Sequence, residues 1–182
     1  MLAYLPTSKL DHIPNKAARR RAVANLYHTC MGTILKLLET LGKTGLHMQS
    51  GDGAVCDCHP ILASDSGDYP EQILVTCTKS GNCPTCPVPQ DKLGNPESVG
   101  KPRKLKPILD ALGTIDNGST AFSCACRDVG IKPIQRPFWQ HLPFVNIFQS
   151  ITPDILHQLY QGNIKHLVKW LQKACGEAEI DV

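Results

Sequence analysis

The sequence predicts a mixed α/β protein, and three local patterns support this fold class. Apolar side chains recur at steps of three and four over residues 16–41, which predicts a long amphipathic helix. The turn signal Gly51-Asp52-Gly53 separates two short extended segments, which predicts a β-hairpin. Near the C-terminus, helix-start residues precede another apolar stripe, which predicts a second long helix.

Composition indicates a soluble globular chain. The 182 residues are 42% hydrophobic and 19% charged, enough for one sizeable core. No apolar run approaches the roughly 18 residues of a membrane span. The N-terminus lacks the basic region of a signal peptide, so we expect an intracellular protein. Its nine cysteines are then expected to be thiols or metal ligands rather than disulfides.

The elements between the two long helices are predicted in turn. The first helix should stop at Gly42 or Gly45. The β-branched segment Ile73–Cys77 favours a strand. Residues 78–107 are rich in Pro, Gly, Lys and Asn and should form a long irregular connection.

Short helices are expected at 104–112 and 119–129, the second stopped by Gly130. The aromatic-rich residues 132–150 should be extended and cover the edge of the core. In the last helix we expect Thr152 as the cap and Pro153 at the first position. Its apolar stripe comprises Leu156, Leu159, Tyr160, Ile164, Leu167 and Leu171.

The motif Cys83-Pro-Thr-Cys86 is the first candidate site. Two cysteines at this spacing can supply half of a tetrahedral zinc site, form a redox dithiol, or be free structural thiols. The chain has no second C-x-x-C. The best completing pair is Asp154 and His157, which share one face of the last helix. From spacing alone, all three interpretations stay open.

Asp68 is the second candidate, expected on a loop at the end of a strand. A catalytic site with two metal ions needs several carboxylates, so from the residues alone the pattern favours a turn residue.

Two clusters of basic residues are candidate phosphate contacts. The formal net charge is only +3, so these local clusters favour phosphate binding more than the net charge of the chain does. A solvated helix face is the alternative. The clusters comprise Lys16, Arg19, Arg20 and Arg21, and Lys101, Arg103, Lys104 and Lys106.

An ordered series of motifs extends over nearly the whole chain, from about residue 2 to residue 171. The motifs are GDYPEQILVTC, CPTCPVP, GIKPI, LPFVNIFQSITPDILHQLYQG and IKHLVKWL. In order and spacing the series resembles the Plavaka-type transposases of fungal DNA transposons, relatives of the CACTA transposases.

The resemblance implies a DDE-type, RNase H-like catalytic core with Asp68 as the second catalytic carboxylate. It implies that Cys83, Cys86, Asp154 and His157 belong to an insertion, where they would hold a structural Zn²⁺. Residues 1–78 would then form a partial RNase H-like core. Residues 79–182 would form the mostly helical insertion subdomain. DNA is the implied partner, and the nucleus the implied location.

The family's first aspartate would lie upstream of this segment and its glutamate downstream. We therefore expect a transposase fragment that does not catalyse alone. In the intact enzyme, Mg²⁺ or Mn²⁺ would support DNA cleavage and strand transfer. The alternatives are a zinc-stabilised module that binds DNA or protein without cutting, a thiol-disulfide protein, and a decayed reading frame.

Overall fold

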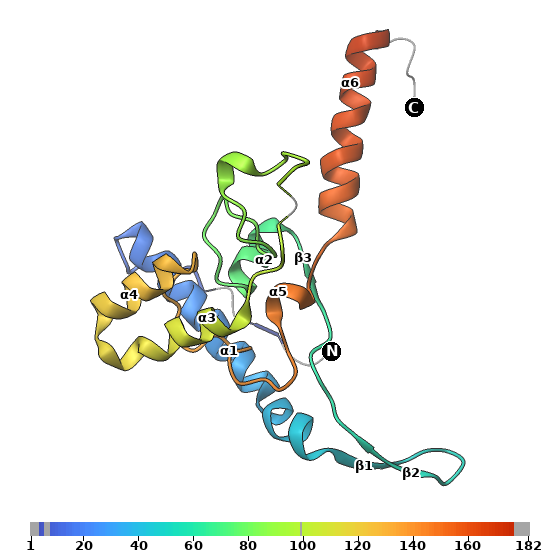
Figure 1. Ribbon diagram of the computed structural model, residues 1–182. Helices are drawn as coiled ribbons and strands as arrows, with labels where there is room; N and C mark the ends of the chain where they lie inside the picture. Colours follow the sequence, from blue (N-terminus) through green and yellow to red (C-terminus); the bar gives the residue numbers. More distant parts are fainter. Residues whose placement is uncertain (1–3, 6–7, 99, 177–182) are drawn as a thin grey trace.

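The computed structural model describes residues 4–5, 8–98 and 100–176 (Figure 1). It confirms a mixed α/β protein that contains helices and two small two-stranded sheets. The first half contains α1 (Lys16–Thr44), β1 (Leu46–Gln49), β2 (Val55–Cys58), β3 (Asp65–Gly67), α2 (Tyr69–Val75) and η1 (Gln90–Lys92). The second half contains α3 (Leu105–Leu112), η2 (Gly113–Asn117), α4 (Ser119–Asp128), α5 (Ile147–Ser150), β4 (Ile151–Pro153), η3 (Ile155–Ile164) and α6 (Lys165–Cys175).

Helix α1 confirms the predicted N-terminal helix. The Asn15 side chain caps its start by accepting the N–H of Ala18 at 3.0 Å. At its end, Gly45 has a φ of 78°, a conformation in which glycine carries no steric penalty, and donates to the Leu41 carbonyl. The helix therefore ends at the second of the two glycines considered from the sequence.

The predicted hairpin is also confirmed. Strands β1 and β2 pair antiparallel, with Leu46 opposite Cys58 and Gln49 opposite Val55. Both strands are exposed along their whole length, and Figure 1 shows them extending from the end of α1. The hairpin thus contributes no buried side chain to the core.

The predicted strand Ile73–Cys77 is wrong, because most of this segment belongs to helix α2. Asp68 caps the helix by accepting the N–H of Glu71 at 2.9 Å, and Pro70 occupies its first turn. These helix-start residues outweigh the β propensity of the short apolar run. The helix buries Gln72 and Val75, and the chain then turns at Cys77, whose φ is 58°.

The aromatic-rich residues 132–150 contribute to the centre of the core. The prediction that they cover its edge is therefore wrong. Phe138, Trp139 and Phe148 are all almost completely buried. Trp139 donates its indole N–H to the Val75 carbonyl at 2.7 Å, so its polar atom is satisfied within the core. Aromatic side chains are few in this sequence, and these three pack in the core.

A single hydrophobic cluster links both predicted domains. It extends from Ala24 and Val75 to Ile108, Cys126 and Ile151. The division between residues 78 and 79 stays a prediction, but both segments contribute to one core.

The start of the last helix differs from the prediction. Thr152 and Pro153 belong to strand β4, and Asp154 is the cap, since it accepts the N–H groups of Leu156 and His157. The helix begins as the π-helical η3 and continues as α6. The predicted apolar stripe exists, but neither segment buries any residue, and Figure 1 shows the helix projecting from the body.

None of the helices in the described ranges is both long and apolar enough to cross a bilayer. The two small sheets do not by themselves establish an RNase H-like core, which stays a prediction.

Candidate functional site

Two candidate aspartates, Asp68 and Asp154, lie at the same end of a small parallel sheet. Strands β3 and β4 pair in parallel, with Gly67 opposite Pro153, and each aspartate directly follows one of these residues. The backbone N–H of Asp154 donates to the Gly67 carbonyl at 3.0 Å, which extends the pairing by one step. The carboxyl ends of neighbouring parallel strands are frequent positions of functional side chains.

Gln72 holds the two strand ends together from the buried side. Its amide nitrogen lies 2.8 Å from the Gly67 carbonyl oxygen and 3.4 Å from that of Thr152. Because Gln72 is only 5% exposed, this bridge is shielded from water. It ties the chain before Asp68 to the chain before Asp154.

His157 contacts Asp154 one turn further along the helix, as the sequence predicted for residues on one face. The ring Nδ1 meets the Asp154 carboxylate. This hydrogen bond raises the pKa of His157 above its usual value, and the negative charges of Asp154 and Asp68 add to the effect. In return, the bond from His157 lowers the pKa of Asp154.

Two further acids are near these aspartates: Asp65 begins strand β3, and Glu71 lies in the first turn of α2. Partial burial raises the pKa of Asp65. Burial also raises the pKa of Glu71, and the charges of Asp65, Asp68 and Asp154 raise it further. The edge is therefore a region of negative potential with His157 as its basic member.

Asp68 and Asp154 differ in how many of their carboxylate oxygens are already hydrogen-bonded. Asp68 uses Oδ1 to cap α2, and no described residue donates a hydrogen bond to its Oδ2. Asp154 uses Oδ1 for Leu156 and Oδ2 for His157. Asp68 is thus the better oriented to give an oxygen to a ligand, while Asp154 has a capping and positioning role.

The motif Cys83-Pro-Thr-Cys86 forms a tight turn around one sulfur atom. The Cys86 N–H donates to Cys83 Sγ at 3.4 Å, and the Thr85 hydroxyl lies 3.1 Å from the same sulfur. Partial burial raises the pKa of the Cys83 thiol, but these hydrogen bonds outweigh it and hold the pKa below its usual value. Burial and the neighbouring Cys83 raise the pKa of Cys86.

The four predicted zinc ligands are not gathered into one site. Within the described ranges, no three His, Cys, Asp or Glu side chains are close enough together to hold a metal ion. The Cys83–Cys86 pair and the Asp154–His157 pair are separate in this arrangement. A zinc ion shared by all four stays a prediction.

Arg103 is distinct from the other residues of the basic clusters because it is buried. Only 5% of it is exposed. Its Nε and Nη2 donate to the Cys83 carbonyl at 3.2 and 3.0 Å, and Nη1 reaches the Val129 carbonyl at 3.5 Å. Its backbone N–H also donates to the Thr85 carbonyl at 2.8 Å. Arg103 therefore fixes the C-x-x-C turn against the end of α4.

The remaining basic candidates lie at the surface. Lys16, Arg20 and Arg21 are exposed in the first turns of α1, whereas Arg19 is half-buried and pairs with Asp11 at 3.0 Å. Basic residues oppose the helix dipole at an N-terminus, so they do not stabilise α1 locally. The exposed residues of the second cluster are Lys101, Lys104 and Lys106.

Sequence reasoning missed the proximity of Asp68 and Asp154, and with it the contributions of Asp65 and Glu71. The acid spacing in DSGDYPE was a usable signal, but only with the correct secondary structure. The erroneous strand at 73–77 concealed the fact that Asp68 opens a helix beside β4.

No curated protein and no solved structure matches the chain. A family model described as Plavaka transposase matches residues 1–171, which is nearly the whole sequence. The motifs around Asp68, Cys83 and Asp154 all fall inside the matched range, and so do both basic clusters. The chain belongs to the Plavaka transposase family.

Proposed function

We propose that this chain is a DNA-binding part of a transposase and that Asp68 is one carboxylate of its catalytic centre. The observation that carries the proposal is the position of Asp68 beside Asp154 at the ends of two parallel strands. Family membership supports DNA as the partner. A protein that acts on chromosomal DNA would work in the nucleus.

The residues at this edge would act on the DNA backbone in different ways. Asp68 would present its free Oδ2 toward the scissile phosphate region, held in place by its cap bond to Glu71. His157, whose pKa is raised, would hold its proton to a higher pH than a free imidazole and, when protonated, would reduce the negative charge that the approaching phosphate meets.

A divalent ion such as Mg²⁺ or Mn²⁺, when bound, would activate the attacking oxygen and stabilise the leaving one. Asp68 fits one ligand position of such an ion, but the described residues do not assemble a full set. The remaining ligands would have to come from other parts of a complete RNase H-like core. We therefore propose that the chain binds DNA but does not cleave it alone.

The exposed basic residues of α1 would supply sequence-independent binding. Together with the dipole of the helix N-terminus, Lys16, Arg20 and Arg21 form a positive region suited to phosphates. If four exposed cations of the two basic clusters contact phosphates of duplex DNA, the logarithm of the binding constant should fall with log salt at a slope of roughly −3 to −4.

The test is fluorescence anisotropy with a labelled duplex across a range of salt concentrations. Changing Arg20 and Arg21 to Ala should weaken binding and make the salt slope shallower. The matched control replaces Lys36 and Lys43, which are exposed further along α1, and should have a smaller effect. Salt-independent binding, or equal effects of the two variants, would contradict the proposal.

The Cys83–Cys86 turn supports a second candidate function, as a zinc or redox element. The pair offers two thiols in one turn, and the hydrogen bonds to Cys83 Sγ favour its thiolate. A structural zinc ion would require two further ligands brought to this turn. Metal analysis and thiol titration separate the outcomes: about one zinc equivalent lost in Cys83→Ser, or a reversible disulfide without metal.

A further inference from the structure

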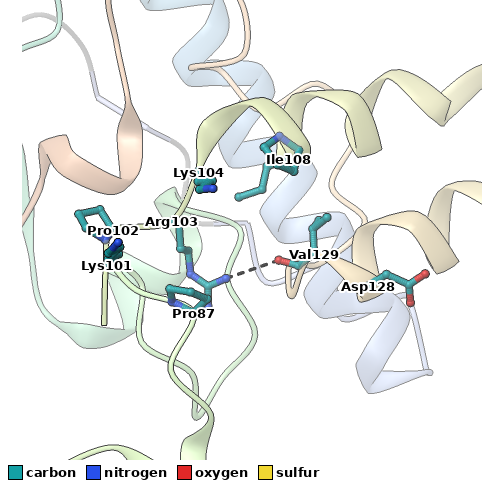
Figure 2. Close-up of a pocket in the computed structure, with 9 residues that line it drawn as sticks. Pro87, Lys101, Pro102, Arg103, Lys104, Ile108, Asp128 and Val129 are labelled. Atoms are coloured by element: carbon teal, nitrogen blue, oxygen red, sulfur yellow. Dashed lines mark hydrogen bonds between the residues drawn. The ribbon is translucent and has the colours of Figure 1, made fainter. Parts of the chain in front are cut away.

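A cavity of about 340 Å³ lies where the C-x-x-C segment meets the start of α3 (Figure 2). One part of its lining is apolar and rigid, with the rings of Pro87, Pro102 and Pro107. Lys101 and Lys104 also line it, and both are exposed to solvent. The cavity therefore combines an apolar wall with positive charge at its mouth, a combination that fits a small ligand with an apolar body and an anionic group.

Arg103 adds a buried charge to the same cavity lining. Only 5% of Arg103 is exposed, and within the described ranges no carboxylate pairs with it. Its three hydrogen bonds go to neutral carbonyl groups and use three of the five N–H donors of a guanidinium. A buried charge without a counter-charge is costly, so a bound anion would stabilise this site.

The acid on the lining does not neutralise these cations. Asp128 lies 3.7 Å from Arg127 at the exposed end of α4, where it already has a basic neighbour. Three basic residues, Lys101, Arg103 and Lys104, thus face one paired acid. The net field at the cavity favours an anion.

We propose that this cavity binds one unpaired nucleotide of a DNA strand. The phosphate would lie at Lys101 and Lys104, with the fixed charge of Arg103 behind it. The sugar and base would pack on the proline rings and on Ile108. The inference rests on the proposed DNA binding and assigns a specific subsite to it.

An unpaired nucleotide fits better than either inorganic phosphate or a duplex. Phosphate alone would leave the proline wall uncovered, whereas a base has an apolar face that packs on such a surface. The volume is at the small end of ligand cavities, so it admits a single nucleotide. Bases within a duplex are stacked on both sides and cannot reach the wall.

The experiment compares single-stranded and duplex oligonucleotides of one sequence by fluorescence anisotropy, with the full chain. In the double variant Lys101→Ala and Lys104→Ala, affinity for the single strand should fall about tenfold, as expected when hydrogen bonds to a charged group are lost. The matched control, Lys43→Ala with Lys92→Ala, removes the same charge at exposed positions outside the lining and outside both basic clusters. It should change affinity by no more than about twofold.

A second variant tests the wall itself. Pro107→Glu places a carboxylate on the lining, and an acid in the first turn of α3 suits the helix dipole, so the variant should fold. It should lower single-strand affinity more than duplex affinity. In competition with the wild-type complex, a nucleoside 5′-monophosphate should be effective at lower concentration than inorganic phosphate.

The outcomes separate this inference from the proposed function. If the wild-type chain binds no DNA at low salt, both fail. If it binds DNA but the cavity variant and the control lose affinity equally, only the nucleotide subsite is overturned. Equal competition by inorganic phosphate and the nucleotide would likewise exclude the proline wall as a binding surface.

Discussion

The ring of His28 stacks on the ring of Phe138 and also accepts a hydrogen bond from that residue's backbone N–H. The ring centroids are 5.6 Å apart, and the Phe138 nitrogen lies 3.4 Å from Nδ1. The other ring nitrogen, Nε2, lies 3.0 Å from the Leu74 carbonyl oxygen. Only the neutral tautomer with its proton on Nε2 satisfies both contacts, because a proton on Nδ1 would face the Phe138 N–H.

This geometry predicts that the protein loses stability in mild acid. Burial lowers the pKa of His28 from 6.5 to about 4, with a smaller contribution from the charge of Lys132. Between these values the unfolded state binds more protons, so the free energy of unfolding rises with pH. The contribution of neutral His28 to the free energy of unfolding is complete above pH 6.5. This free energy should fall by about 3 kcal/mol as the pH falls toward 4.

Urea unfolding at pH 7 and pH 4.5 checks this prediction. His28→Gln should be less stable at pH 7, because it loses core contacts, but should lose less on acidification than the wild type. His141→Gln, at an exposed position, should retain the wild-type pH dependence. The same acid sensitivity in His28→Gln and wild type would show that another group is responsible.

Removing the Arg103 side chain should destabilise the region around the C-x-x-C turn. Arg103→Ala leaves the Cys83 and Val129 carbonyls without their donors. We expect the free energy of unfolding to fall by about 1.5–3 kcal/mol, the range for hydrogen bonds to charged groups. Lys104→Ala, one residue away and exposed, should change it by less than about 0.5 kcal/mol. Similar losses in both variants would argue against the anchoring role.

Asp68 has a structural role that is separable from any role in catalysis. Asp68→Ala removes the cap of α2 and should cost about 1 kcal/mol of unfolding free energy. Asp68→Asn keeps an oxygen for the Glu71 N–H and should be close to neutral. Chemical denaturation of the three proteins measures the difference. Equal stability of the Ala and Asn variants would mean that the cap bond contributes little.

The isolated chain should not nick or join DNA in the presence of Mg²⁺ or Mn²⁺. The reason is that the described residues assemble no complete metal site around Asp68 and Asp154. A supercoiled plasmid assay measures this with high sensitivity. Cleavage above background that disappears in the stably folded Asp68→Asn variant would overturn the prediction.

Elements with local signals were predicted well from the sequence. In helix α1 the apolar residues recur with the period of a helix, and a glycine ends it. The hairpin has a turn signal between its strands, so neither element depends on distant contacts. The segment at 73–77 was ambiguous, because a short apolar run suits a strand or a helix. Its outcome depended on the cap supplied by Asp68.

The candidate site was predicted only in part, for a related reason. The residues Asp68, Asp154 and His157 were identified, and the contact between the last two follows from helix geometry. The parallel pairing of β3 with β4 joins segments far apart in the sequence, and no local pattern encodes it. The burial of Arg103 likewise depends on carbonyl groups from two distant segments.

The projecting C-terminal helix has a consequence for cooperativity. Since η3 and α6 bury no side chain, they gain none of the packing energy that stabilises most protein helices. Their amide hydrogens should exchange with solvent through local opening of low free energy, independently of the core around Cys77 and Ile131. We therefore expect the described chain to unfold as two cooperative units, and shortening it after Asp154 should leave the unfolding transition of the first almost unchanged.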